Sequence, residues 1–242
     1  MRVAVISDVH GNLHALEAVL AALAEDAPDE VWSLGDVVGY GPRPNPCCEL
    51  VAARARIGLA GNHDLGVLGA IDLDEFSNEA AESARWTRTV LLDESRAYLE
   101  KLPSQTTAPD AQLFHASPRD PVWDYVLTAD AALEALELTE APVVLVGHSH
   151  VALAIGLDSQ ELSGGLAPAG HEVDLSRGRW LLNPGSVGQP RDGDPRAAYL
   201  LLDREAQQAR FCRVSYPVER TQAEIRERNL PDALAHRLAH GV

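Results

Sequence analysis

Five short polar stretches of the sequence carry side chains that bind metal ions or transfer protons in proteins. They are SDVHGN (7–12), LGDVVGYGP (34–42), GNHD (61–64), FHASP (114–118) and GHSH (147–150). Each stretch alone has an ordinary structural explanation, because Asp and Asn cap helices, Gly and Asn form turns, and histidines pack inside cores. Each also follows an apolar run, and five unrelated turns would not be expected to carry only Asp, His and Asn. The set as a whole therefore indicates one shared site.

The candidate ligands combine imidazole nitrogens with carboxylate and amide oxygens and include no thiolate, which suits borderline or hard divalent ions. They are too many for one tetrahedral ion and suit two ions that share a bridging carboxylate. Two carboxylates against two divalent ions leave the centre cationic, so it would attract a phosphate and lower the pKa of a bound water. The candidate ligands are Asp8, His10, Asp36, Asn62, His115, His148 and His150.

Four other histidines do not follow an apolar strand in this way. They are His14, His171, His236 and His240, and we assign them to the surface or to packing.

A recurring strand-then-helix pattern would position these stretches. Residues 2–7 are typical of a buried strand, and residues 12–26 carry apolar side chains at helical spacing. The pattern repeats with a strand at 30–35, a helix at 45–55 and a strand at 56–61. Later apolar runs predict strands at 111–117, 142–150, 151–157 and 178–186, and a hairpin formed by 197–203 and 209–216.

Strands that alternate with helices, followed by a strand-rich second half, predict an α/β fold of layered sheets with helices outside. Ligands of such sheets collect beyond the carboxyl ends of the strands. No linker divides the chain, so we expect a single domain over residues 1–242. Residues 74–91 and 93–102 predict two helices, and a helical tail from Pro217 places Leu230, Leu234 and Leu238 on one face. The tail could pack on its own domain or on a partner, so the oligomeric state stays open.

The chain is strongly acidic, with 20 Lys and Arg against 36 Asp and Glu and a net charge of −16. This charge disfavours long nucleic acids and anionic membranes as partners, although a small phosphorylated substrate could still bind a local cationic centre. Three cysteines with no CxxC pair argue against a disulfide framework and against a zinc site formed by cysteines. The N-terminus is too polar for a signal peptide and no apolar run reaches membrane-spanning length, so we expect a cytoplasmic protein.

The five stretches, in order, closely resemble the signature of calcineurin-like metallophosphoesterases, which reads DxH, GD, GNH[DE], a lone His and GHxH. The resemblance runs from Ser7 to His150. GYGPRPNP, RWTR, ASPRDPVWDY and NPGSVGQPR further resemble the bacterial predicted phosphodiesterase branch and extend it to Arg191. The resemblance implies a four-layer α/β/β/α sandwich of two mixed β-sheets flanked by helices. It also implies two divalent ions, chosen from Mn, Fe, Zn, Co and Ni.

The roles of individual residues follow from the same resemblance. Asp8, His10 and His150 would hold the first ion. Asn62, His115 and His148 would hold the second, and Asp36 would bridge both.

His63 matches the catalytic histidine of the family, which faces the leaving-group oxygen, and Asp64 would orient its imidazole. Protein phosphatases of the family read GDYVDRG where this chain reads GDVVGYG, which weakens a protein-phosphatase assignment. Arg119 and Arg191 are candidates for contact with the phosphate. A helical flank or cap at about 66–102, including Trp86 and Tyr98, would lie near the entrance and restrict substrates to small molecules.

The implied function is hydrolysis of phosphate esters, in which a hydroxide that bridges two ions attacks phosphorus. Small phosphodiesters, including nucleotides, are the expected substrates. A phosphomonoesterase and a dinucleoside polyphosphate hydrolase are alternatives within the enzymes. A non-catalytic metal-binding scaffold is the alternative from another class, because the retromer complex contains a scaffold subunit of this fold. The presence of His63 with all the candidate ligands favours an enzyme, and the acidic charge disfavours a nuclease of long DNA or RNA.

Overall fold

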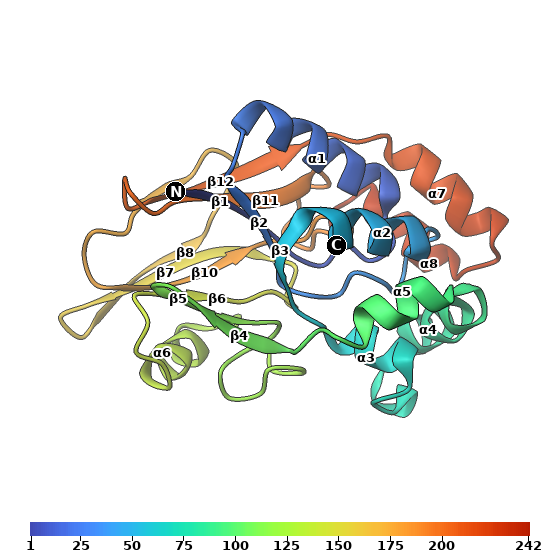
Figure 1. Cartoon of the computed structure of the whole chain (residues 1–242), viewed down its shortest axis with the longest axis horizontal. Coiled ribbons are helices and arrows are strands. Elements are labelled where there is room, and N and C mark those ends of the chain that lie inside the picture. The colour runs from blue at the N-terminus through green and yellow to red at the C-terminus, as the bar shows by residue number, and fades with distance from the viewer.

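Two six-stranded β-sheets pack face to face in the computed structural model, which describes all 242 residues (Figure 1). The first sheet has the order β3-β2-β1-β11-β12-β9, and the second has the order β4-β5-β6-β10-β7-β8. The strands of the first are β1 (Arg2–Ile6), β2 (Glu30–Ser33), β3 (Ala55–Gly58), β9 (Glu172–Asp174), β11 (Ala197–Asp203) and β12 (Gln208–Val214). Those of the second are β4 (Gln105–Ala108), β5 (Ala111–Phe114), β6 (Val143–Leu145), β7 (Ala152–Asp158), β8 (Glu161–Leu166) and β10 (Arg179–Pro184).

Both sheets are mixed. In the first sheet β1 runs parallel to β2 and antiparallel to β11, and in the second β10 runs parallel to β6 and antiparallel to β7. The predicted hairpin is the antiparallel pair of β11 and β12. The expected α/β fold of two mixed sheets flanked by helices is therefore confirmed.

Alternation along β1 shows how the layers are held. Val3 and Val5 are buried between the two sheets, whereas Ala4 and Ile6 are buried under the outer helices. Helices α1 (Leu13–Asp26) and α2 (Pro44–Arg54) cover the first sheet, and α6 (Ala129–Glu137) covers the second (Figure 1). Because both faces of the central strands β1, β6 and β11 are buried, these strands read as continuous apolar runs.

Several elements were not predicted. Helix α6 follows its cap residue Thr128, whose side chain accepts a hydrogen bond from the Ala131 amide, but its alanine-rich sequence carries no long apolar run. Strand β8 contains two glycines and is mostly exposed, so it lacks the β-branched and aromatic residues that mark strands. The predicted strand at 56–61 is also shorter, because β3 ends at Gly58 and a helix begins at Asn62.

A group of short helices follows β3. It consists of α3 (Asn62–Leu68), the 3-10 turn Leu73–Glu75, α4 (Asn78–Val90) and α5 (Asp93–Leu99). Helices α4 and α5 correspond to the two pieces predicted at 74–91 and 93–102.

The C-terminal tail packs on its own domain. It forms α7 (Val218–Glu227) and α8 (Asp232–Leu238), and Leu230, Leu234 and Leu238 are buried in one cluster with Tyr40 and Ala80. The leucine face expected from the sequence is therefore an intramolecular contact.

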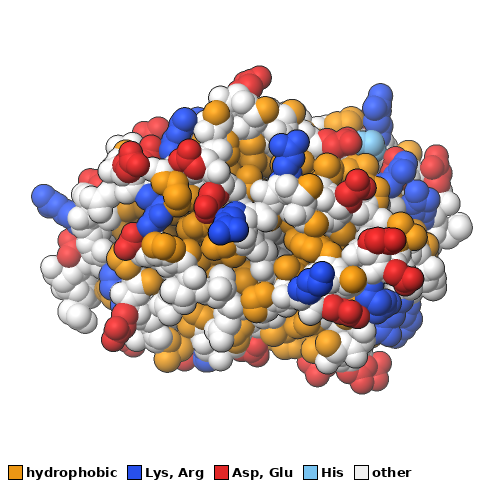
Figure 2. Space-filling view, viewed as in Figure 1, with side chains coloured by type: hydrophobic (Ala, Val, Ile, Leu, Met, Phe, Trp, Pro, Cys, Tyr) orange, Lys and Arg blue, Asp and Glu red, His pale blue; other side chains and the backbone are white.

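The surface mixes both signs of charge. On the face in Figure 2, Lys and Arg side chains are scattered among Asp and Glu and form no continuous stripe. No helix combines the length and the apolar character that crossing a bilayer requires.

Candidate metal centre

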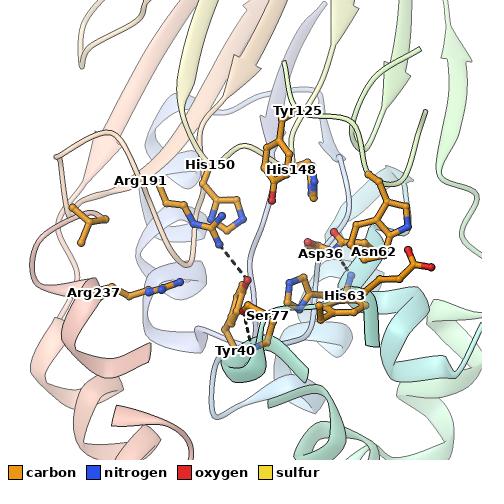
Figure 3. A pocket seen from close by; sticks show the side chains of 15 residues that line it. Asp36, Tyr40, Asn62, His63, Ser77, Tyr125, His148, His150, Arg191 and Arg237 are labelled. Carbon is orange, nitrogen blue, oxygen red and sulfur yellow. Dashed lines mark hydrogen bonds between the residues drawn. The ribbon is translucent and has the colours of Figure 1, made fainter. Parts of the chain in front are cut away.

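The five polar stretches meet at one cavity. Asp8 and His10 follow β1, Asp36 follows β2, and His115 follows β5. His148 and His150 follow β6, so the carboxyl ends of parallel strands in both sheets deliver these side chains. The cavity has a volume of about 440 Å³, and its wall includes candidate ligands, His63 and several aromatic side chains (Figure 3).

The backbone of these loops is turned sharply to aim the side chains inward. Five candidate ligands have left-handed backbone conformations, which non-glycine residues rarely adopt. Such conformations persist only where the surrounding structure holds them, and they cluster at functional sites. The φ angles are 55° at Asp8, 49° at His10, 53° at Asp36, 62° at His148 and 59° at His150.

Backbone hydrogen bonds tie the loops to one another. The Asp8 amide donates to the Gly35 carbonyl at 3.0 Å, and the His10 amide donates to the Asp36 carbonyl at 2.9 Å. The His148 amide donates to Asp8 Oδ2 at 3.2 Å, which joins loops from the two sheets. The candidate ligands are thus held by the fold.

One glycine allows a close approach between two of the polar stretches. A Cβ atom on Gly61 would lie 2.1 Å from Asp36 Oδ1 and 2.5 Å from His115 Cε1. The glycine before Asn62 therefore makes room for the Asp36 carboxylate.

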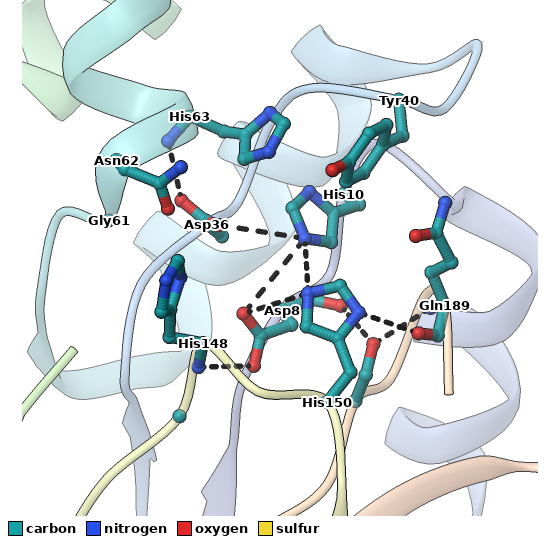
Figure 4. Close-up of polar contacts among 12 residues, drawn as sticks. Asp8, His10, Asp36, Tyr40, Gly61, Asn62, His63, His148, His150 and Gln189 are labelled. Atoms are coloured by element: carbon teal, nitrogen blue, oxygen red, sulfur yellow. Dashed lines mark hydrogen bonds and ion pairs between the residues drawn. The ribbon is translucent and has the colours of Figure 1, made fainter. Parts of the chain in front are cut away.

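The ligand atoms fall into two groups that share one carboxylate, and Figure 4 shows the residues of the first group. Asn62 Oδ1 lies 3.3 Å from His115 Nε2 and so adjoins the second group. No side chain of this set is more than 3% exposed. Asp8, His10, Asp36 and His150 form the first group and Asp36, His115 and His148 the second, with the atoms of each group within 4.8 Å of one another.

The hydrogen bonds of the histidines leave ligand atoms free. Nδ1 of His10 bonds the Val38 carbonyl at 3.1 Å, and Nδ1 of His150 bonds the Gln189 carbonyl at 2.6 Å. A carbonyl only accepts, so each Nδ1 carries the proton and each Nε2 presents a lone pair. The two Nε2 atoms face each other at 3.0 Å. Two facing lone pairs are satisfied when a cation lies beside both.

Unpartnered buried atoms point to the same conclusion. Asp8 Oδ1, Asp36 Oδ2 and His148 Nε2 are buried and have no hydrogen-bond partner. Buried polar atoms normally find partners, and an ion is a common reason for an exception. The residues of the centre therefore fit divalent ions.

Burial shifts the titration of the centre toward neutral groups. It raises the pKa of Asp8 to about 7, and it raises the pKa of Asp36 well above its usual range with the help of the neighbouring Asp64 carboxylate. It lowers the pKa of His148 to about 2, with His115 adding to the effect. Neutral imidazoles are the form that binds metals, and a bound cation would favour ionised carboxylates.

His63 and Asp64 lie on the first turn of α3. The imidazole of His63 packs against Tyr40 at 4.3 Å and Phe76 at 5.1 Å between ring centroids, and its Nδ1 atom has no hydrogen-bond partner. No hydrogen bond joins it to Asp64, which we expected to orient this ring. The Asp64 carboxylate instead accepts backbone amides of Val37 at 3.2 Å, Val38 at 3.0 Å and Gly61 at 3.1 Å. Asp64 thus fastens the loop after Asp36 to the start of α3.

The two candidate arginines lie in different places. Arg191 lines the cavity and donates to Gln189 Oε1 at 2.9 Å and to the Tyr40 hydroxyl at 3.3 Å. Arg119 is not part of the cavity wall, because its guanidinium is half-exposed and pairs with Asp124 and Glu134. The structure brings only Arg191 to the site.

The expected helical cap at 66–102 contributes only a few residues to the cavity wall. Glu75, Phe76, Ser77 and Ala80 line the cavity. Trp86 lies instead beside the Arg228 guanidinium, and Tyr98 lines a separate groove with α2. Neither ring reaches the centre.

Sequence reasoning missed part of the cavity wall. Trp123 and Tyr125 line the cavity and lie in the stretch ASPRDPVWDY. This stretch resembles the predicted phosphodiesterase branch, and that resemblance could have identified them as site residues. Arg237, on α8, had no such signal. The four histidines assigned to the surface or to packing do not line the cavity.

The family model of the calcineurin-like phosphoesterase superfamily domain matches residues 1–207 of the chain. A metallophosphoesterase from Sphaerobacter thermophilus has a similar structure, with a TM-score of 0.90 and 45% sequence identity over 100% of both chains. Uncharacterized protein MJ0912 of Methanocaldococcus jannaschii is 36% identical over 245 residues, covering 99% of this chain and 98% of that protein. Phosphodiesterase YfcE of Escherichia coli K12 is 27% identical over 210 residues, covering 85% of this chain and 89% of that protein.

Proposed function

The chain belongs to the calcineurin-like phosphoesterase superfamily, a family of metal-dependent hydrolases of phosphoester bonds, and we propose that it cleaves small phosphodiesters at two divalent ions. The observation that carries this proposal is the pair of buried ligand groups that share Asp36. One carboxylate shared between two sets of further ligands is the arrangement that a dinuclear centre needs.

The proposed assignment follows the two groups. When bound, two divalent ions would activate a water molecule as the nucleophile and offset negative charge on the phosphoryl oxygens. Asp8, His10 and His150 would hold the first ion and Asn62, His115 and His148 the second, with Asp36 shared by both.

His63 would protonate the oxygen of the leaving group. Its imidazole lines the cavity with Asn62, and the rings of Tyr40 and Phe76 pack against it. Asp64 would act as a positioning residue, because its bonds to three backbone amides hold the start of α3 where Asn62 and His63 lie. Arg191 would contact the phosphate from the other side of the cavity (Figure 3).

Small phosphodiesters, nucleotides among them, suit this cavity best. Its volume of about 440 Å³ matches small-molecule sites, and Phe76, Trp123 and Tyr125 supply flat apolar surface for a base or aryl group. The name of the relative YfcE supports a diester over a monoester. We further propose manganese as a native ion, and a cytoplasmic location in keeping with three free cysteines.

Metal analysis of the purified protein, combined with substrate assays with and without Mn²⁺, tests the proposal. We expect about two ions per chain, the number of a two-metal site, and Mn²⁺-dependent cleavage of bis-p-nitrophenyl phosphate in preference to p-nitrophenyl phosphate. Diadenosine tetraphosphate with product chromatography tests the polyphosphate alternative. A chain that binds no metal would overturn the proposal, and one that holds two ions but cleaves nothing would favour a scaffold.

A further inference from the structure

Two arginines in the wall of the cavity come from distant parts of the chain and share one hydrogen-bond acceptor. Arg191 lies in the loop after β10, and Arg237 lies on α8. The first guanidinium donates to Gln189 Oε1 at 2.9 Å and the second donates to the same oxygen at 3.3 Å. Gln189 is only 2% exposed, so its amide is a fixed part of the structure.

This arrangement leaves two positive charges without a negative partner. Neither guanidinium forms an ion pair with a carboxylate, and an amide oxygen is neutral. Arg191 Nε is buried and has no hydrogen-bond partner at all. An unused buried donor is unfavourable, and guanidinium groups bind the oxygens of phosphates with paired hydrogen bonds. The two side chains together therefore suit an anion.

The same glutamine connects the arginines to the metal centre. Its backbone carbonyl accepts the proton of His150 Nδ1 at 2.6 Å, and the Arg191 amide donates to the His150 carbonyl at 3.1 Å. Figure 3 shows both arginines on the side of the cavity away from Asn62 and His63. A phosphate at the metal centre would thus have the arginines on one side and His63 on the other.

We propose that Arg191, beyond its contact with the phosphate at the metal centre, forms with Arg237 a subsite for a second phosphoryl group, so that the preferred phosphodiesters carry a further phosphoryl group beside the one that is cleaved. This proposal rests on the proposed function only in placing the first phosphoryl group at the metal centre. The subsite needs α8, which lies beyond residues 1–207 that match the family model. The subsite therefore includes a residue from outside the part of the chain that the family model matches.

Binding of two inert ligands tests the subsite. Methylphosphonate carries one phosphonate group and methylenediphosphonate carries two, and neither can be hydrolysed at an ester bond. We would measure both dissociation constants by calorimetry on Mn²⁺-loaded protein, with metal content checked after each titration. We expect the diphosphonate to bind at least about tenfold more tightly, and Arg237→Gln to reduce this preference about tenfold, the scale of a charge-assisted hydrogen bond.

Arg220→Gln is the matched control, because Arg220 is an exposed arginine on α7 that is not part of the cavity wall. It removes the same charge and should leave the preference and the phosphoesterase activity unchanged. Thermal melting shows whether each variant is folded. If Arg237→Gln does not fold, Arg191→Gln removes the other half of the subsite and should reduce the preference by a similar factor.

An unchanged ratio of the two dissociation constants in folded variants would overturn the subsite, whether both ligands bind as before or both bind more weakly. Turnover of bis-p-nitrophenyl phosphate by the unaltered protein reports separately on the proposed function. Loss of the ligand preference in Arg237→Gln, together with turnover of bis-p-nitrophenyl phosphate by the unaltered protein, supports both proposals. Turnover without any preference in the unaltered protein rejects the subsite alone, and preference without turnover rejects the proposed function alone.

Discussion

At the scale of single residues, the centre combines strained backbone with unpartnered buried atoms. His148 has a left-handed backbone, and its Nε2 atom lacks a hydrogen-bond partner. Asp8 and Asp36 combine the same two features. Each feature costs free energy in the protein alone, and a bound cation would offset the loss of hydrogen bonds. Substitutions here should therefore separate metal binding from proton transfer.

Asp36→Asn should remove both metal binding and hydrolysis. Asparagine keeps the shape and can still accept the His63 amide, which now donates to Asp36 Oδ1 at 2.9 Å, so the fold should persist. It loses the charge that both ligand groups share. We expect metal content to fall together with turnover, as measured by elemental analysis and bis-p-nitrophenyl phosphate assays. Asp158→Asn, at an exposed aspartate, is the control. An Asp36→Asn protein with full metal content and activity would show that Asp36 is not shared.

His63→Asn should keep the metals and lose turnover. His63 belongs to neither ligand group, and its imidazole lines the cavity. General acid catalysis contributes at least about a hundredfold in rate, and we expect a loss of that size for substrates with poor leaving groups. A series of aryl phosphodiesters with leaving groups of increasing pKa measures it. If the variant cleaves the poorest leaving group at the unaltered rate, His63 does not protonate it.

At the scale of elements, the start of α3 explains the stretch GNHD. Gly61 gives the Asp36 carboxylate its space, and Asp64 accepts amides from the loop after β2. Asn62 and His63 then lie side by side on one helical turn, with one adjoining a ligand group and the other facing the cavity. The motif is thus a connection between two loops as well as a source of functional groups.

The docking of α7 supplies a prediction about pH. Glu224 on α7 accepts Arg43 Nε at 2.7 Å and Arg43 Nη2 at 2.8 Å, and the Arg43 hydrogen bond lowers the pKa of Glu224 below its usual value. A lowered pKa in the folded state stabilises the protein above the unfolded pKa of about 4.3. This stabilisation is lost as the pH falls through the folded pKa, because the carboxylate becomes protonated.

We expect Glu224→Gln to lower the free energy of unfolding by about 1 kcal/mol at neutral pH, since the pair is partly exposed. The difference from the unaltered protein should shrink below about pH 4, where Glu224 itself loses its charge. Urea unfolding at several pH values measures both, with Glu25→Gln at an exposed position of α1 as the control. A difference that stays constant with pH would mean that the ion pair does not stabilise the docking of α7.

At the scale of the whole molecule, the net charge of the chain and the charge proposed for the cavity have opposite signs. The chain carries a net charge of −16, while the proposed ions and two arginines make the cavity cationic. Such a distribution admits a small anion at short range and repels a long polyanion. The size of the cavity and the charge distribution of the protein therefore both favour small anionic substrates.

Long DNA should bind very weakly. At about 0.15 M salt, where the Debye length is about 8 Å, we expect a dissociation constant for a long duplex no tighter than about 10⁻⁴ M, the weak end of non-specific binding. Fluorescence anisotropy with labelled DNA and Mn²⁺-loaded protein measures it. Micromolar binding would show that a local basic surface outweighs the net charge.

The strand-and-helix pattern and the five polar stretches could be predicted from the sequence, because they depend on residues close together in the chain. Strand ends in parallel order bring Asp8, Asp36 and His148 together once the two sheets form. The partners of Asp64 and Arg119 could not be predicted, since their hydrogen bonds depend on which loops lie beside them. Helix α6 and strand β8 were not predicted for a different reason, because neither has a distinctive local sequence pattern.

Local sequence by itself determined which side chains form the candidate metal centre and that layered sheets present them. Only the tertiary structure decided that Arg191 rather than Arg119 reaches the cavity and that Arg237 joins it. Arg237 and Gln189 are 48 positions apart, and their contact exists because buried leucines of the tail hold α8 against the body of the domain. The sequence states which side chain stands at each position, whereas packing of the folded chain decides which distant positions come into contact.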